Sequence, residues 1–189
     1  LLGDSQDIYA ETKRRAEELV ISFCASNGID YVIIRPVMVY GENDVKGNMA
    51  KLIRQLDRGF FPLFNQGKNI KEVLYVKNLI AAVSEMVHRD DWDNQTVSLK
   101  DPETITMHDI CQKIIEILGH RCFLLPVPQC MVSASVAGVK VLQCFGFLSN
   151  LNSNSIRRLG EDISCVGTND PMLERRMEFS SAQGLENTV

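Results

Sequence analysis

Two side chains near the start of the chain have the types and the spacing of an acid/base pair. Tyr9 and Lys13 are four residues apart, in a stretch whose apolar side continues through Leu19, Val20 and Phe23, which predicts an amphipathic helix. Residues four apart on a helix share one face, with their Cβ atoms roughly 6 Å apart. A free phenol titrates near ~10, and a fixed ammonium beside it favours the phenolate. Such a pair can exchange a proton with a hydroxyl or carbonyl group.

A helix, a strand and a loop must position this pair. Asn27 and Gly28 end the predicted helix, and residues 31–35 form an apolar run that is too short for a helix. Such a run is typical of a strand in a parallel sheet. Because Tyr and Lys also occur four apart on many solvated helix faces, the order of the following segments decides the interpretation.

The segments YAETKRRAEELV, then Asn27-Gly28, then YVIIRPVMVYG follow one another in an order that resembles the extended short-chain dehydrogenase/reductase family. Its NAD-dependent nucleotide-sugar epimerases and dehydratases, which include UDP-glucose 4-epimerase-like proteins, carry a Tyr-x-x-x-Lys helix followed by such a strand and a Val-Tyr-Gly turn. The resemblance continues through residues 45–49 and 71–79 and, faintly, through 184–188. It implies an α/β fold, the C-terminal part of a Rossmann-type doubly wound parallel sheet plus a smaller mixed α/β substrate-binding lobe.

The family's domain organisation implies how this chain is divided. Residues 1–100 would form the C-terminal part of the dinucleotide-binding domain, with substrate-lobe segments interleaved at about 42–72, and residues 101–189 would form mainly the substrate-binding lobe. No G-x-x-G-x-x-G follows a strand, although in the family this fingerprint and the catalytic Ser/Thr precede the Tyr-x-x-x-Lys helix. We therefore expect about 100–130 further residues upstream of Leu1, so that this chain is the C-terminal portion of a longer enzyme.

The resemblance implies residue roles at matching positions. Tyr9 would be the catalytic acid/base, and Lys13 would favour its phenolate and bind the nicotinamide ribose of NAD or NADP. Pro36 would line the nicotinamide end of the cleft, at the carboxyl edge of the strand. For a nucleotide-sugar substrate, the expected contact residues are Asn48, Leu63, Phe64, Lys71 and Arg158.

The substrate contacts have separate reasons. Asn48 begins a predicted helix and is placed to donate hydrogen bonds to phosphate, with Arg158 as a second phosphate contact. Leu63 and Phe64 would pack on the base. Lys71 stands where many relatives have arginine, and an ammonium neutralises a phosphate without forming a bidentate fork.

Met38 is a further departure from the family pattern. Relatives that bind UDP-sugars often have asparagine there, and a thioether cannot donate a hydrogen bond. The sugar, the nucleotide and the choice between epimerase, dehydratase and reductase therefore stay open.

Composition excludes several other classes of protein. A net charge of −4 and a pI near 5.4 argue against a nucleic-acid binder. The six cysteines form no C-x-x-C pair and the three histidines show no ligand spacing, which indicates free thiols in a reducing cytoplasm and no metal site. The first residues also lack the pattern of a signal peptide.

Two alternatives concern interaction rather than catalysis. Residues 130–148 hold one charge, Lys140, over the length of a marginal membrane span, but a central lysine costs roughly 2.5–3.5 kcal/mol on insertion. We therefore interpret this segment as a buried or interface helix. The missing Gly-rich turn also leaves open a cofactor-free, catalytically inactive remnant that dimerises through the helix of Tyr9. A homodimer is expected in either case.

Local patterns predict the remaining elements. Helices are expected over residues 48–59, over 79–88, over 106–118 with Gly119 as the stop, and from Ser180 onward. Residues 60–64, 73–76 and 96–99 are predicted to be extended.

Overall fold

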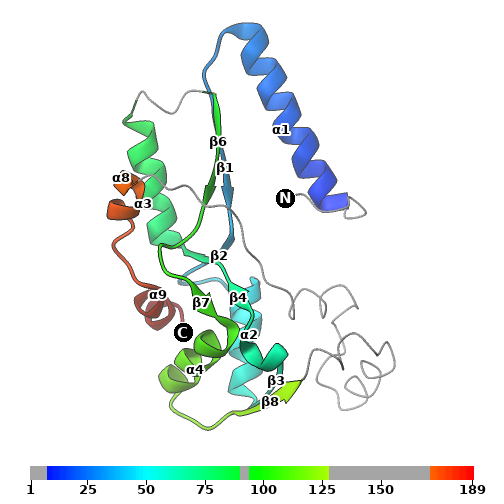
Figure 1. Ribbon diagram of the computed structural model, residues 1–189, viewed down its shortest axis with the longest axis vertical. Coiled ribbons are helices and arrows are strands. Elements are labelled where there is room, and N and C mark those ends of the chain that lie inside the picture. The colour runs from blue at the N-terminus through cyan, green and yellow to red at the C-terminus, as the bar shows by residue number, and fades with distance from the viewer. Residues whose placement is uncertain (1–7, 90–93, 128–170) are drawn as a thin grey trace.

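The computed structural model describes residues 8–89, 94–127 and 171–189 of the chain. Within them the fold is α/β, with short strand pairs between helices (Figure 1). Helix α1 (Ile8–Asn27) stands beside the first strand, apart from the other helices. The expected α/β class with parallel strands is confirmed.

Two parallel strand pairs form the part of the structure next to α1. Strand β1 (Val32–Pro36) pairs with β6 (Gln95–Leu99), and β2 (Met38–Tyr40) pairs with β5 (Val73–Tyr75). Parallel neighbours require long crossover connections, so residues distant in the sequence meet here. Helix α3 (Val76–Val87) follows β5 directly.

One hydrophobic core lies between these strands, α3 and α8 (Pro171–Arg176). Its buried residues are Leu74, Ala82, Met86, Val97, Leu99, Leu173 and Met177. The end of the chain thus covers a helix almost a hundred residues upstream, a contact that no local pattern reveals.

Two further strand pairs form the other part. Strand β3 (Phe60–Phe64) pairs in parallel with β8 (Phe123–Val127). The two-residue strands β4 (Ile70–Lys71) and β7 (Ile105–Thr106) pair antiparallel. A short 3₁₀ turn, η1 (Asn65–Gly67), connects β3 to β4.

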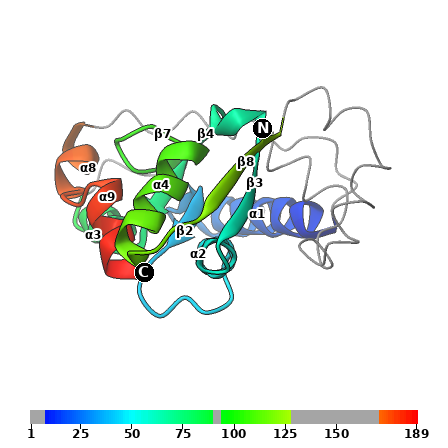
Figure 2. The same cartoon turned by 90° about the horizontal axis from the view of Figure 1, so that it is seen from below.

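Three helices close this second part: α2 (Asn48–Asp57), α4 (Met107–Leu118) and α9 (Ser181–Thr188). Helices α4 and α9 lie side by side, as the view from below shows (Figure 2). A second hydrophobic core lies among these helices and strands and includes residues of β2 and β5. Its buried residues are Tyr40, Met49, Leu56, Phe61, Leu63, Val73, Tyr75, Met107, Ile110, Cys111, Ile114 and Leu185.

Most of the predicted elements are confirmed, with some boundaries shifted. Helix α4 begins where Thr106 accepts a hydrogen bond from the backbone of Asp109, and it ends at Gly119, whose φ of 70° is left-handed. Helix α3 begins at Val76 rather than at residue 79, because Tyr75 ends its strand and caps the helix without a loop. Residues 128–170, and with them the apolar segment 130–148, lie outside the described residues.

The apolar side of α1 faces away from the sheet. Of the residues in α1, only Cys24 is buried among the described part of the chain. Leu19 and Phe23 are 69% and 62% exposed. An apolar helix face of this kind, uncovered by any described residue, is typical of a surface that another element or another chain covers.

Candidate functional site

Tyr9 and Lys13 do lie on one side of α1. The Lys13 Nζ atom stands 5.7 Å from the centroid of the Tyr9 ring, within the range of a cation–π contact. The Tyr9 side chain is 70% exposed and Lys13 is exposed as well, so the described residues do not enclose the pair. The phenol can be reached from solvent and can approach a bound molecule.

Strand β1 holds the second part of the expected cofactor region. Pro36 is its last residue and is exposed, and the following Val37 donates a backbone hydrogen bond to Leu99. Helix α1 and strand β1 run in opposite directions (Figure 1), so the N-terminal half of the helix accompanies the carboxyl half of the strand. Ligands of open α/β sheets bind at this edge of the sheet.

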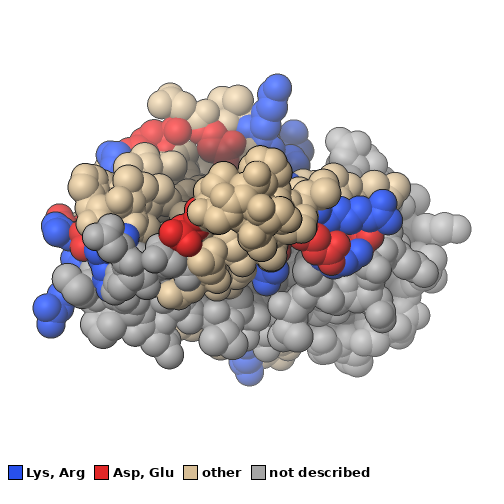
Figure 3. All heavy atoms as spheres, turned by 90° about the horizontal axis from the view of Figure 1, so that it is seen from above, with Lys and Arg blue, Asp and Glu red and all other residues tan. Residues whose placement is uncertain are grey.

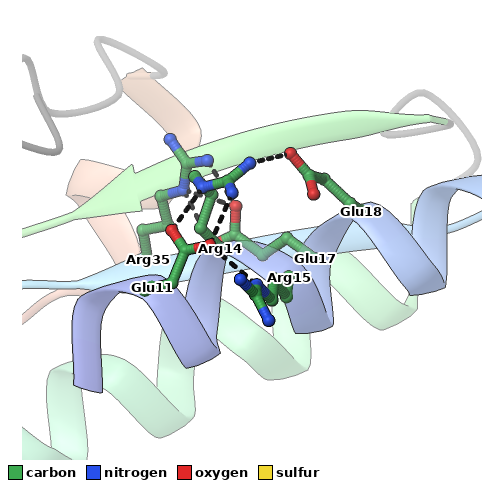
Figure 4. A network of polar contacts seen from close by, with 6 residues as sticks. All are labelled: Glu11, Arg14, Arg15, Glu17, Glu18 and Arg35. Atoms are coloured by element: carbon green, nitrogen blue, oxygen red, sulfur yellow. Dashed lines mark hydrogen bonds and ion pairs between the residues drawn. The ribbon is translucent and has the colours of Figure 1, made fainter. Parts of the chain in front are cut away.

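An ion pair that the sequence did not suggest joins the two elements. The Arg35 Nε atom donates to both carboxylate oxygens of Glu17, at 3.0 and 3.1 Å, and Nη2 donates to Oε2 (Figure 4). This fork lowers the pKa of Glu17 and raises that of Arg35. The only sequence signal was a carboxylate one turn after Lys13, and its partner lies 18 residues away.

The other charged residues of α1 pair within the helix. Glu11 accepts from Arg14 at 2.9 and 2.8 Å and from Arg15 at 2.7 Å, and Arg14 also contacts Glu18 (Figure 4). The hydrogen bonds from Arg14 and then Arg15 hold the pKa of Glu11 down, at about 2. The carboxylate of Glu11 is therefore ionised at neutral pH, and Glu11 and Glu18 each already have a cation beside them.

Asn48 was predicted to contact a phosphate. It is the exposed first residue of α2, after a polar loop in which Asp44 accepts a 2.7 Å hydrogen bond from the Gly47 backbone. Glu42 in the same loop pairs with Lys77 at 2.7 Å and accepts from the Tyr75 hydroxyl at 2.7 Å. Lys77 and then Tyr75 lower the pKa of Glu42 to about 2.

The remaining expected substrate residues lie in different surroundings. Leu63 and Phe64 are 4% and 5% exposed and belong to the interior. Lys71 is 5% exposed in β4. Arg158 lies outside the described residues. The substrate roles of all these residues stay predictions.

The turn η1 beside Phe64 has an unusual backbone. Asn65, Gln66 and Gly67 have φ values of 50°, 55° and 71°, three left-handed residues in succession. A Cβ at Gly67 would lie 2.8 Å from the Cβ atom of His108, so only glycine fits against α4. Left-handed non-glycine residues are typical of turns that the surrounding structure holds in place.

A cavity of about 390 Å³ lies at the opposite end of α1 from Tyr9, with Cys24, Gly28 and Tyr31 among its lining residues. It is therefore separate from the Tyr9–Lys13 pair. The thiols of Cys24, Cys111 and Cys122 are free, as expected.

Charged side chains of both signs lie on the described surface. At the end of the molecule seen from above, cationic and anionic side chains are interspersed with uncharged ones (Figure 3). No helix among residues 8–89, 94–127 and 171–189 is long and apolar enough to cross a membrane. In the same residues, no three His, Cys, Asp or Glu side chains come together as a metal site would require.

The known proteins similar to this chain include nucleotide-sugar epimerases, a dehydratase and a 3 beta-hydroxysteroid dehydrogenase/Delta 5-->4-isomerase of Mycobacterium tuberculosis, which is 29% identical over 123 residues. UDP-glucose 4-epimerase of Vibrio cholerae is 26% identical over 124 residues, which are 65% of this chain and 38% of that protein. UDP-glucose 4-epimerase of Thermotoga maritima, solved with UDP-glucose, superposes with a TM-score of 0.62 at 17% identity, over 95% of this chain and 51% of that one. dTDP-glucose 4,6-dehydratase of Bacillus anthracis, solved with NAD, has a TM-score of 0.62 at 13% identity, over 98% and 51%.

These solved structures support the α/β fold, and the chain spans about half of their length or less. The segment with Tyr9, Lys13, β1 and Pro36 lies within residues 3–98, which match the model of the NAD dependent epimerase/dehydratase family. Since this match covers half of the sequence and includes the Tyr-x-x-x-Lys helix with the strand that follows it, the chain belongs to the NAD dependent epimerase/dehydratase family.

Proposed function

We propose that this chain forms part of a cytoplasmic, NAD-dependent oxidoreductase of the nucleotide-sugar 4-epimerase or dehydratase type. Tyr9 would be its catalytic acid/base. The observation that carries the proposal is the Lys13 ammonium 5.7 Å from the exposed Tyr9 ring, on the helix that the family model covers. The relatives that bind UDP-glucose and NAD support the substrate and cofactor classes.

The donors present fit one end of the cofactor. A phenol and an ammonium on one helix face, beside the strand that ends at Pro36, suit a ribose with two hydroxyl groups and a nicotinamide ring. The 189 residues hold no G-x-x-G-x-x-G turn for the pyrophosphate. The active enzyme would therefore need such a turn in addition to this segment. NAD, when bound, supplies the acceptor for a transient hydride.

The chain's own residues would handle the proton. The Tyr9 phenolate would take the proton of the sugar hydroxyl as that carbon is oxidised, and would return it when the carbonyl is reduced. Lys13 would stabilise the phenolate and bind the ribose. Asn48, Lys71 and Arg158 would bind the diphosphate, while Leu63 and Phe64 would border the base after local rearrangement of the interior.

The test is Y9F in the full-length enzyme, measured by turnover of UDP-glucose or a related nucleotide-sugar. Loss of the phenol oxygen should lower kcat by roughly 10²–10⁴-fold. Y31F is the matched control, because Tyr31 lies at the other end of α1 beside the separate cavity. Near wild-type turnover by Y9F would refute the assigned role.

A second function is favoured by the exposed apolar side of α1. Leu19 and Phe23, 69% and 62% exposed, lie one helical turn apart and could pack against the same helix of a second copy. The chain would then act as a dimerisation module, either within an active homodimer or as a cofactor-free remnant.

Two measurements on the 189-residue chain separate these possibilities. Light scattering after size exclusion should show a dimer that L19E/F23E converts to a monomer, whereas I80E, at a residue 61% exposed on α3, should stay dimeric. A wild-type monomer at ~100 μM would exclude the dimer. Saturable micromolar binding of NADH to the same chain would count against a cofactor-free remnant.

A further inference from the structure

The position of Tyr9 depends on how α1 is held. Within the described residues, the one buried residue of α1 is Cys24, near its C-terminal end. Tyr9 is 15 residues further toward the N-terminus, about 22 Å along the helix. A rotation of about 5° around Cys24 would therefore move Tyr9 by about 2 Å.

The contact between Glu17 and Arg35 restrains this rotation. It lies between Cys24 and Tyr9 and joins α1 directly to the carboxyl end of β1 (Figure 4). A bidentate guanidinium–carboxylate contact fixes both a distance and an orientation, which a single hydrogen bond does not. The other ion pairs that α1 forms with described residues stay within the helix and do not orient it against the strand.

The same contact decides which residue Lys13 meets. Glu17 follows Lys13 by four residues, the spacing at which opposite charges pair along a helix. Both oxygens of Glu17 instead accept hydrogen bonds from Arg35, and the Lys13 ammonium stands over the Tyr9 ring.

The nearby charges fit this arrangement. Along the helix from Tyr9 and Lys13, the described charged groups of α1 include Glu11 and Arg14 as well as Glu17, and β1 contributes Arg35. Glu11 is already bound by Arg14 and Arg15. Among these groups, Glu17 is the carboxylate one turn from Lys13, and its two oxygens accept hydrogen bonds from Arg35.

We propose that Arg35 is a positioning residue for the Tyr9–Lys13 pair: by binding Glu17 it orients α1 against β1 and prevents Glu17 from pairing with Lys13. The catalytic consequence rests on the proposed function, whereas the side-chain arrangement does not. Without Arg35, Glu17 draws the ammonium away from the phenol.

The arrangement can be measured in the 189-residue chain without substrate or cofactor. Nuclear magnetic resonance of the Lys13 CεH₂ group, assigned by comparison with K13R, should show an upfield ring-current shift that Y9A removes. R35Q should lose at least half of this shift, and R35Q/E17Q should regain it because the competing carboxylate is gone. R35K, which keeps the charge but not the planar fork, should lose an intermediate part.

R176Q is the matched control. Arg176 makes an exposed ion pair with Glu85 at 2.9 Å, between α8 and α3. Because this pair does not involve α1, the R176Q variant should keep the full shift of the Lys13 CεH₂ resonance. Far-UV circular dichroism shows whether each variant is folded. If R35Q is unfolded, R35K replaces it in the test. A full shift in the Arg35 variants, or no recovery in R35Q/E17Q, overturns the proposal.

A kinetic experiment tests the consequence for catalysis. In the full-length enzyme, R35Q should lower kcat about tenfold or more while KM changes less than about twofold, because misplacement of a catalytic group acts mainly on the chemical step. An R35Q enzyme with unchanged kcat overturns the positioning role. Failure of the proposed function would appear separately, as undiminished turnover by Y9F.

Discussion

Asp101 should make the chain more stable at mildly acidic pH than at neutral pH. Its carboxylate is 1% exposed and accepts hydrogen bonds from Asn78 Nδ2 at 2.8 Å and from the Tyr75 backbone at 3.1 and 3.2 Å. Burial nevertheless raises the pKa of Asp101 from 3.8 to about 6, against the opposing effect of these hydrogen bonds. The ionised form is therefore less favourable in the folded chain than in the unfolded one.

The sign of the effect follows from proton binding. Between pH 3.8 and about 6, the folded chain keeps a proton on Asp101 that the unfolded chain has lost. The stabilisation is fully present below pH 3.8 and is lost as the pH rises through about 6. The shift of about two pKa units corresponds to at most about 3 kcal/mol in the free energy of unfolding.

The D101N variant isolates this contribution. The new amide oxygen can accept from Asn78, while the amide nitrogen would face the Tyr75 N–H, which adds a cost that does not vary with pH. We therefore expect the difference in unfolding free energy between wild type and D101N to change by up to about 3 kcal/mol from pH 4 to pH 7, in the direction that disfavours the wild type at pH 7.

Urea unfolding followed by circular dichroism at half-unit pH steps measures this difference. D30N, at an exposed aspartate, controls for the loss of one negative charge. A wild-type minus D101N difference that is constant from pH 4 to pH 7, or that changes in the opposite direction, would refute the reasoning.

Three further predictions concern single contacts. G184A should destabilise the fold by about 1–3 kcal/mol in urea unfolding, because a Cβ there would lie 2.4 Å from the Tyr40 hydroxyl oxygen. T106A should lose the cap of α4 and about 1 kcal/mol, measured in the same way. D57N should lower the pKa of His120 in an NMR titration, because the 2.9 Å hydrogen bond to Asp57 raises it. The stabilisation from that pair should correspondingly be present below pH ~6.5 and be lost as the pH rises through the raised pKa.

The sequence predicted the elements that local patterns determine. Helix α4 has apolar residues at helical spacing, a capping threonine at one end and Gly119 at the other, and all three signals agree. Strand β8 was not predicted. Its Pro126 pairs with Leu63 in the register of a parallel ladder, although a proline has no N–H to donate to such a ladder. Strands β4 and β7 hold two residues each, too few to show a period.

The surroundings of the site residues were less predictable, since exposure depends on distant segments. Lys71 and Asn48 were both expected at a phosphate, but the Lys71 side chain is buried and Asn48 lies at an exposed helix start. Asn78 resembles an ordinary helix residue in the sequence. It forms two hydrogen bonds with the backbone of Phe179, 101 residues later, and so ties the segment between α8 and α9 to α3.

Helix α1 shows why the two kinds of prediction differ. Its formation is local, because Glu11, Arg14 and Glu18 pair three and four residues apart along one side. Its orientation is not local, because it depends on Cys24 and on the contact of Glu17 with Arg35 in the next strand. A Tyr-x-x-x-Lys spacing can therefore predict that the phenol and the ammonium meet, whereas only the strand that follows determines where they meet. For this reason the chemistry of the pair should be more sensitive to changes at Arg35 than to changes within the charged side of the helix itself.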